Sequence, residues 1–207
     1  MMNVLTPPAL SLRAHGGFCR HMGSKERVAV FIDGSNLYYK LRSLEIKSKR
    51  SFDFHGLAYW LARGREVVSQ RYYVGVVRAK EGDERGQQLR KRQQQLFSHL
   101  SSSSQGFVVS RGYLMENDGT YHEKGVDVQL AIDLIVSAYE DECDTCILVS
   151  SDTDLIPAIR KVRTLGKNIE YIGFAHQPSL GLQKYATTSR LLIREEVLPF
   201  EGKSPKE

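Results

Sequence analysis

Acidic and hydroxyl side chains are concentrated in one stretch, Ser150-Ser-Asp-Thr-Asp154. It directly follows the apolar run from Cys146 to Val149, which predicts a short strand buried on both faces. A helical pattern that ends at Gly166 comes next, carried by Leu155, Ile156, Ile159, Val162 and Leu165. Asp152 and Asp154 therefore lie where a buried strand meets a helix, the edge at which ligands bind in open α/β sheets. A helix cap needs only one such residue, so this stretch favours a function.

A second junction of this kind lies near the start of the chain. Val28 to Ile32 predicts a buried strand, and Asp33-Gly34-Ser35-Asn36 follows it directly. A helix is then indicated by Leu37, Tyr38, Leu41 and Leu44. Gly34 permits a tight turn or a close approach to a ligand. Two junctions that pair a strand end with an acid weigh against a purely capping role for Asp33.

A third acid, Asp127, lies in the first turn of a helix predicted to open at Glu123-Lys-Gly-Val-Asp127. Asp133 is six residues further on, which places it roughly 240° around that helix. The two carboxylates cannot share a face. We therefore expect Asp127 to point towards a site near the helix start and Asp133 to be bonded within the fold.

The chemistry of these acids follows from their convergence. Asp33, Asp127 and Asp152, with Asp154, should meet at the carboxyl edge of the sheet, where they would repel one another and raise each other's pKa. A divalent cation removes that conflict, and an all-oxygen ligand set selects Mg²⁺ or Mn²⁺. Such an ion commonly works on phosphate esters by polarising the phosphoryl oxygen and activating water.

Other cofactor sites lack a matching pattern. No Walker A motif is present, and the six histidines show no metal-binding spacing. Cys143 and Cys146 form a lone C-x-x-C without a second pair, so we expect them to bind no zinc, with Cys146 in the core.

The predicted elements alternate between strand and helix. Strands are predicted at 28–32, 67–77, 107–109, 146–149 and 168–172, with a hairpin around 113–121, a polar helix at 83–100 and a short helix at 180–185. The expected fold class is α/β: a three-layer α/β/α sandwich with a mainly parallel sheet of about five strands. Residues 191–200 are expected to cover one side of that sheet. Residues 1–24 are predicted to be a disordered leader, 25–200 a single domain and 201–207 a frayed tail.

Length, charge and cysteine content limit the number of domains, the kind of partner and the cellular compartment. The 207 residues suit one α/β domain, and a net charge of +5 with a pI of about 9.1 permits a polyanionic partner. The sequence has no run of apolar residues of membrane-spanning length, and three cysteines argue for a reducing, cytoplasmic setting. The helix at 83–100 carries Arg85, Arg90, Lys91 and Arg92, a pattern more often solvated than bound to a partner.

Three segments resemble the NYN domain, in particular its LabA-like members, within the PIN-like nuclease superfamily: VAVFIDGSNLYY, EKGVDVQLAIDL and ILVSSDTDLIPAIRKVRTLGKNIEYIGF. The resemblance runs from about Val28 to about Arg194. It implies a PIN-like Rossmannoid sheet and metal-dependent ribonuclease chemistry. The positions that match the family's pattern are the acids Asp33, Asp127, Asp152 and Asp154, together with Asn36 and Lys124.

The sequence therefore predicts a cytoplasmic, Mg²⁺- or Mn²⁺-dependent endoribonuclease. The catalytic residues would be Asp33, Asp127, Asp152 and Asp154, the first three holding the metal. Substrate contacts are predicted for Ser35, Asn36, Arg78, Lys80, Lys124 and Ser151. The alternatives are a catalytically idle RNA-binding or regulatory module, and a Toprim-like enzyme acting on DNA. RNA is the expected partner, no membrane contact is expected, and a homodimer is left open.

Overall fold

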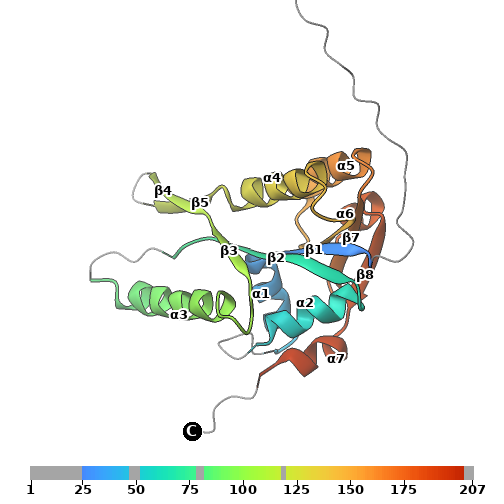
Figure 1. Cartoon of the computed structure of the whole chain (residues 1–207). Coiled ribbons are helices and arrows are strands. Elements are labelled where there is room, and N and C mark those ends of the chain that lie inside the picture. Colours follow the sequence, from blue (N-terminus) through green and yellow to red (C-terminus); the bar gives the residue numbers. More distant parts are fainter. Residues whose placement is uncertain (1–24, 47–51, 78–81, 118–119, 203–207) are drawn as a thin grey trace, which may run out of the picture.

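The computed structural model describes residues 25–46, 52–77, 82–117 and 120–202. A six-stranded parallel sheet with the order β3-β2-β1-β6-β7-β8 forms its centre (Figure 1). The strands are β1 (Arg27–Asp33), β2 (Glu66–Val74), β3 (Val108–Arg111), β6 (Thr145–Val149), β7 (Asn168–Phe174) and β8 (Thr188–Leu192). A separate antiparallel hairpin consists of β4 (Tyr113–Asn117) and β5 (Thr120–Lys124).

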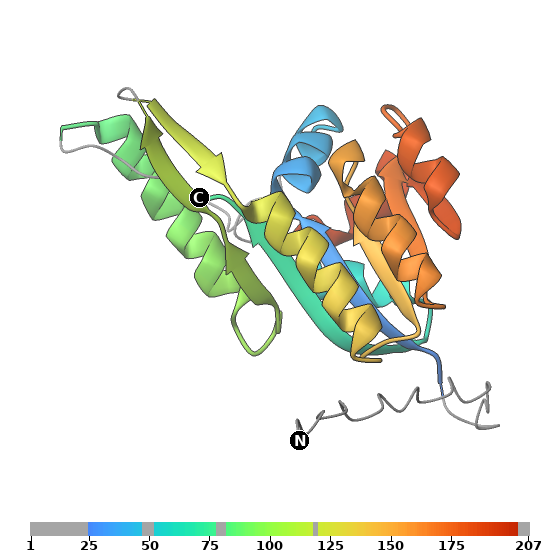
Figure 2. The same ribbon diagram turned by 90° about the horizontal axis from the view of Figure 1, so that it is seen from above.

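Helices cover both faces of the sheet (Figures 1 and 2). One face carries α1 (Gly34–Ser43), α2 (Phe54–Ala62), α3 (Glu84–Leu100), α7 (Arg194–Val197) and the 3₁₀ turn η2 (Leu198–Phe200). The other face carries α4 (Val126–Tyr139), the 3₁₀ turn η1 (Thr153–Leu155), α5 (Ile156–Thr164) and α6 (Leu180–Tyr185). The α/β fold class and the three layers predicted from the sequence are confirmed.

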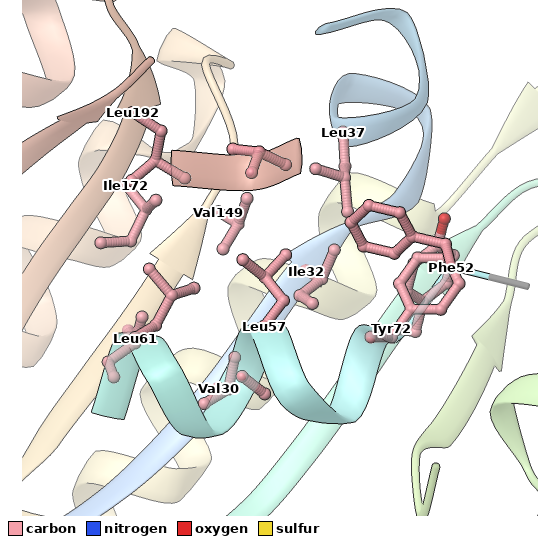
Figure 3. Packing of buried hydrophobic residues seen from close by; sticks show 14 of the residues in the cluster. Val30, Ile32, Leu37, Phe52, Leu57, Leu61, Tyr72, Val149, Ile172 and Leu192 are labelled. Carbon is pink, nitrogen blue, oxygen red and sulfur yellow. The ribbon is translucent and has the colours of Figure 1, made fainter. Parts of the chain in front are cut away.

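Each face of the sheet has its own apolar core. On β1, Val28, Val30 and Ile32 enter one core, while Ala29 and Phe31 enter the other. Figure 3 shows the first, in which Val30 and Ile32 pack with Leu37, Leu57, Leu61, Tyr72, Val149, Ile172 and Leu192. Burying one such aliphatic side chain contributes about 1.5–3 kcal/mol. Burial on both faces explains why these strands are continuous apolar runs rather than alternating ones.

The predicted strand count was too low because the edge strand β8 was missed. Residues 188–192 pair in parallel with β7, but Thr188 and Ser189 are exposed and Arg190 is only half-buried. An edge strand with one solvated side lacks the apolar run that identified the inner strands. The predicted hairpin is confirmed as β4 and β5. The predicted leader at 1–24 and most of the tail lie outside the described residues, as do Arg78 and Lys80.

The chain leaves the two central strands of the sheet, β1 and β6, towards opposite faces. The helix after β1 lies on one face and the helix after the neighbouring β6 on the opposite face (Figure 1). The connections therefore diverge above the carboxyl ends of β1 and β6, which is the topological switch point where α/β sheets bind ligands. Along the described part of the chain, no helix combines the length and apolar character needed to cross a membrane.

Candidate functional site

Asp33 is the last residue of β1 and is only 4% exposed. It caps α1, with Oδ1 accepting the backbone N–H of Asn36 at 3.0 Å. Its Oδ2 accepts the Asn36 side-chain amide at 2.8 Å and the hydroxyl of Ser150 at 2.9 Å. Asp33 is therefore both the helix cap that its position suggested and a buried carboxylate fixed in one orientation.

The second junction is bonded directly to the first. The Ser151 N–H donates to Oδ1 of Asn36 at 3.2 Å, and the Asp152 N–H donates to Oγ of Ser150 at 3.1 Å. Asp152 then caps η1 by accepting the Asp154 N–H at 2.9 Å. Asn36, Ser150 and Ser151 thus hold the ends of β1 and β6 together and set the position of Asp152 beside Asp33.

Asp127 approaches this pair from the third element. Gly125 precedes α4 with a φ of 93°, a left-handed conformation that glycine adopts without strain, and Asp127 lies in the first turn of that helix. The pKa of Asp127 is raised, first by partial burial and then by the negative charges of Asp152, Asp33 and Asp154. The four carboxylates predicted from the sequence therefore lie near enough at the switch point for three of them to act electrostatically on Asp127.

The arrangement fits a hard cation by its chemistry. Within the described residues, no group of three or more His, Cys, Asp or Glu side chains is already arranged to bind a metal ion. However, an ionised carboxylate offers about four lone-pair positions, and Asp33 uses three of them. Asp127 accepts no hydrogen bond from any described residue, and its pKa is raised by partial burial and by the nearby carboxylates. An oxygen-lined site with this charge suits Mg²⁺ or Mn²⁺.

The remaining predicted contact residues are less closely grouped. Ser35 is exposed in the first turn of α1. Lys124 ends β5, one residue before Gly125, so its backbone is next to the start of α4. Asn36 and Ser151 belong to the network that joins the two strand ends.

Lys40 was not predicted and borders the same region. It lies one turn after Asn36 on α1, and both line a small recess with Ser150 and Ser151 over an apolar floor of Leu37, Val149, Ile172 and Phe174. Its Nζ donates to the backbone and side-chain oxygens of Gln177, each at 3.0 Å, and burial lowers its pKa. The i, i+4 spacing from Asn36 was the available signal, but a lysine on an amphipathic helix is usually only solvated.

Asp133 is bonded within the fold, as predicted. Its carboxylate accepts the Tyr73 hydroxyl and the Gln129 amide, each at 2.7 Å, and the Arg71 guanidinium lies 3.8 Å away. Asp133 is therefore a structural residue, whereas Asp127 on the same helix lies near the other carboxylates. Cys146 lies in the core as expected, and Cys143 is equally buried, with 3.6 Å between the two sulfur atoms.

Comparisons with known proteins agree with this architecture. The chain is 38% identical over 167 residues to MJ0482 of Methanocaldococcus jannaschii, a protein described as uncharacterized. The match covers 81% of this chain and 55% of that protein, so the chain spans about half the length of this relative. The fold resembles the crystal structure of VPA0982 from Vibrio parahaemolyticus, a protein of unknown function, with a TM-score of 0.62 and 24% identity. That match covers 84% of this chain and 96% of the other.

The family model for the NYN domain matches residues 27–192. This range runs from the first residue of β1 to the last residue of β8, so it includes the whole sheet and all four carboxylates. The chain belongs to the NYN domain family, which has a PIN-like nuclease fold.

Proposed function

We propose that the protein is a Mg²⁺- or Mn²⁺-dependent endoribonuclease that hydrolyses RNA phosphodiester bonds. The observation that carries this proposal is the convergence of Asp33, Asp127, Asp152 and Asp154 at the switch point of a sheet whose family consists typically of nucleases. We further assign the chain to the LabA-like branch of the family on the sequence motifs described above.

Each acid has a distinct part in the proposed site. Asp33, Asp127 and Asp152 would hold the cation, which when bound would polarise the phosphoryl group and neutralise developing charge. Asp33 is held in place by Asn36 and Ser150, so it supplies a preorganised oxygen ligand. Asp154 lies at the start of η1, and its exposed carboxylate would orient water towards the scissile phosphate.

RNA would approach from the carboxyl edge of the sheet. Ser35 and Asn36 in the first turn of α1 and Ser151 after β6 offer hydroxyl and amide groups for phosphate and 2′-hydroxyl contacts. We also propose that Lys124, Arg78 and Lys80 contact the RNA backbone, because Lys124 is the last residue of β5 and the other two follow β2 in the sequence by four and six residues. Lys124 is additionally three residues from Asp127, at the entrance to α4.

A second candidate is an RNA-binding module that does not cut. The observation that favours it is that Asp33 already accepts three hydrogen bonds from its own chain. A carboxylate committed in this way can serve as a structural link between β1 and β6 without any metal. The two candidates differ in whether cleavage occurs, and not in whether RNA binds.

The experiment compares nucleic acids and metals. The purified protein is incubated with unstructured RNA, hairpin RNA and DNA of the same sequence, in EDTA, Mg²⁺ or Mn²⁺, and the products are separated on a denaturing gel. We expect internal cleavage of RNA only when a divalent metal is present. Tight RNA binding without cleavage under any metal would favour the second candidate, and preferential cleavage of DNA would contradict the proposal.

A further inference from the structure

The N-terminal half of α3 is exposed along almost its whole length. Residues 84, 85 and 87–92 are all exposed, Leu89 to 44%, and only Gly86 in this half is buried. The C-terminal half is different, because Phe97 and Leu100 are buried and Leu100 joins the core. Most helices gain their stability from one buried apolar face. The half from Glu84 to Arg92, which we call the α3 arm, has none.

The α3 arm extends beyond the carboxyl edge of the sheet. Gln93 marks that edge, since its side chain accepts the Val77 N–H at 2.7 Å and donates to the Gly75 carbonyl, just after β2 ends. The nine residues before Gln93 therefore project by about 14 Å at 1.5 Å per residue. Figure 1 shows this end of α3 at the outer left of the molecule, away from α1 and α2. The four carboxylates lie at the same edge of the sheet.

The cations of the α3 arm lack the partners that other arginines have. Arg27, Arg65, Arg71 and Arg190 each pair with a carboxylate between 2.6 and 3.2 Å. By contrast, Arg85, Arg90, Lys91 and Arg92 make no hydrogen bond or ion pair with any residue that the structure describes. Glu84 is the only carboxylate in α3 itself. Within the described residues, the arm thus presents four cations without an ion-pair partner, together with the single carboxylate of Glu84.

The cations also point in several directions. At about 100° per residue, Arg85 and Arg92 lie within about 20° of each other, while Arg90 and Lys91 lie about 140° and about 120° away on opposite sides. An extended single strand would pass only one side of such a helix. A folded RNA brings two phosphate strands, or a strand and a loop, around it, and arginine suits phosphate through bidentate contacts.

We propose that the α3 arm is a binding element for folded RNA, which it holds beside the carboxylate site so that the strand emerging from a stem reaches that site. This inference rests on the proposed function for its choice of ligand. It gives the enzyme a preference for structured over unstructured RNA. The recognition is made through phosphates and is therefore independent of sequence.

The test uses two full-length variants that each lose four charges. In the arm variant, Arg85, Arg90, Lys91 and Arg92 are all changed to glutamine, which retains helix propensity. In the control variant, the exposed cations of α5 and α6 at the opposite end of the molecule (Arg160, Lys161, Arg163 and Lys184) are changed in the same way. Affinity is measured against a hairpin RNA and an unstructured RNA of equal length, with EDTA present, over a range of salt. Thermal melting establishes that both variants are folded.

We expect the arm variant to bind the hairpin about tenfold or more weakly at about 0.1 M salt, with a salt slope reduced by about one for each phosphate that the arm no longer neutralises. Its affinity for the unstructured RNA and its cleavage of a short unstructured RNA should change by less than about threefold, because few of those phosphates reach the arm. Hairpin affinity equal to that of the parent, or an equal reduction in the control variant, would overturn this inference. If the parent cuts no RNA yet the arm variant loses hairpin affinity selectively, the proposed function fails while the inference stands.

Discussion

Replacing the two aspartates of α4 by asparagine, one at a time, separates a proposed metal ligand from a structural acid. Asp133 accepts hydrogen bonds from Tyr73 and Gln129 at 2.7 Å and lies near Arg71. An amide at this position loses the charge and one acceptor, which should cost about 2 kcal/mol. For a domain of this size that corresponds to a fall in melting temperature of roughly 4–8 °C. Manganese-dependent RNA cleavage per folded molecule should be retained.

The Asp127→Asn variant should behave in the opposite way. Burial and the neighbouring carboxylates raise the Asp127 pKa in the folded state, so its ionised form opposes folding. Protonated Asp127 therefore favours the folded state. This contribution to folding stability is fully present below the unfolded pKa of about 4 and is lost as the pH rises through the higher folded pKa. At neutral pH without metal, Asp127→Asn should therefore melt at or above the parent temperature, while cleavage collapses.

The assay is a set of thermal melts in EDTA at several pH values, together with Mn²⁺-dependent cleavage of RNA by both variants. The stability advantage of Asp127→Asn over the parent should appear above about pH 4 and disappear below it. If Asp127→Asn melted several degrees below the parent at neutral pH, Asp127 would be a structural acid and the reasoning would be refuted. The same conclusion would follow if Asp127→Asn retained full activity.

Three further predictions concern the two buried cysteines, Gly34 and the affinity for Mn²⁺. Changing Cys143 and Cys146 to serine should leave the metal content of the purified protein unchanged in elemental analysis, whereas loss of stoichiometric zinc would contradict the assignment of both thiols to the core. Gly34→Ala should cost about 1–3 kcal/mol in chemical denaturation, because the new Cβ would lie 2.3 Å from the buried Tyr72 ring, and an unchanged midpoint would refute that packing. Mn²⁺ affinity measured by calorimetry should weaken as pH falls through the raised Asp127 pKa, and a pH-independent affinity would exclude this carboxylate as a ligand.

The strand–acid–helix junctions were predictable because the inner strands of a parallel sheet are buried on both faces. That burial requires continuous apolar runs, as in Val28–Ile32 and Cys146–Val149, and makes the polar residues that follow conspicuous. The approach of Asp33 and Asp152 followed from placing the carboxyl ends of parallel strands at one edge, and that of Asp127 followed from its place in the first turn of a helix. Helical phase was sufficient to separate Asp133 from Asp127.

Features that depend on tertiary contacts were not predictable. The edge strand β8 has a solvated side, so its pattern was indistinguishable from that of a loop. Nothing in the sequence distinguished the three proposed metal ligands from one another. In the structure, Asp33 is nearly buried and accepts three hydrogen bonds, whereas Asp127 accepts none from the described residues. Asp33→Asn should therefore lower stability, unlike Asp127→Asn, because two donors already face its Oδ2.

The projection of α3 is a further example. Its composition shows basic and glutamine-rich positions, but only the bonds of Gln93 to Gly75 and Val77 reveal how much of the helix lies beyond the sheet. A helical pattern shows which side of the helix each side chain lies on. It does not show how much of the helix packs against the rest of the domain.

The most direct test of the proposed site is Mn²⁺-dependent RNA cleavage by Asp33→Asn and Asp152→Asn, corrected for the folded fraction, with Asp133→Asn as the matched control. Both changes retain the size of the side chain and remove a charge that the cation requires. We predict that both variants lose cleavage while still binding RNA, and that Asp133→Asn cleaves at the rate of the parent. Cleavage at the parent rate by either Asp33→Asn or Asp152→Asn would contradict the assignment of the metal site.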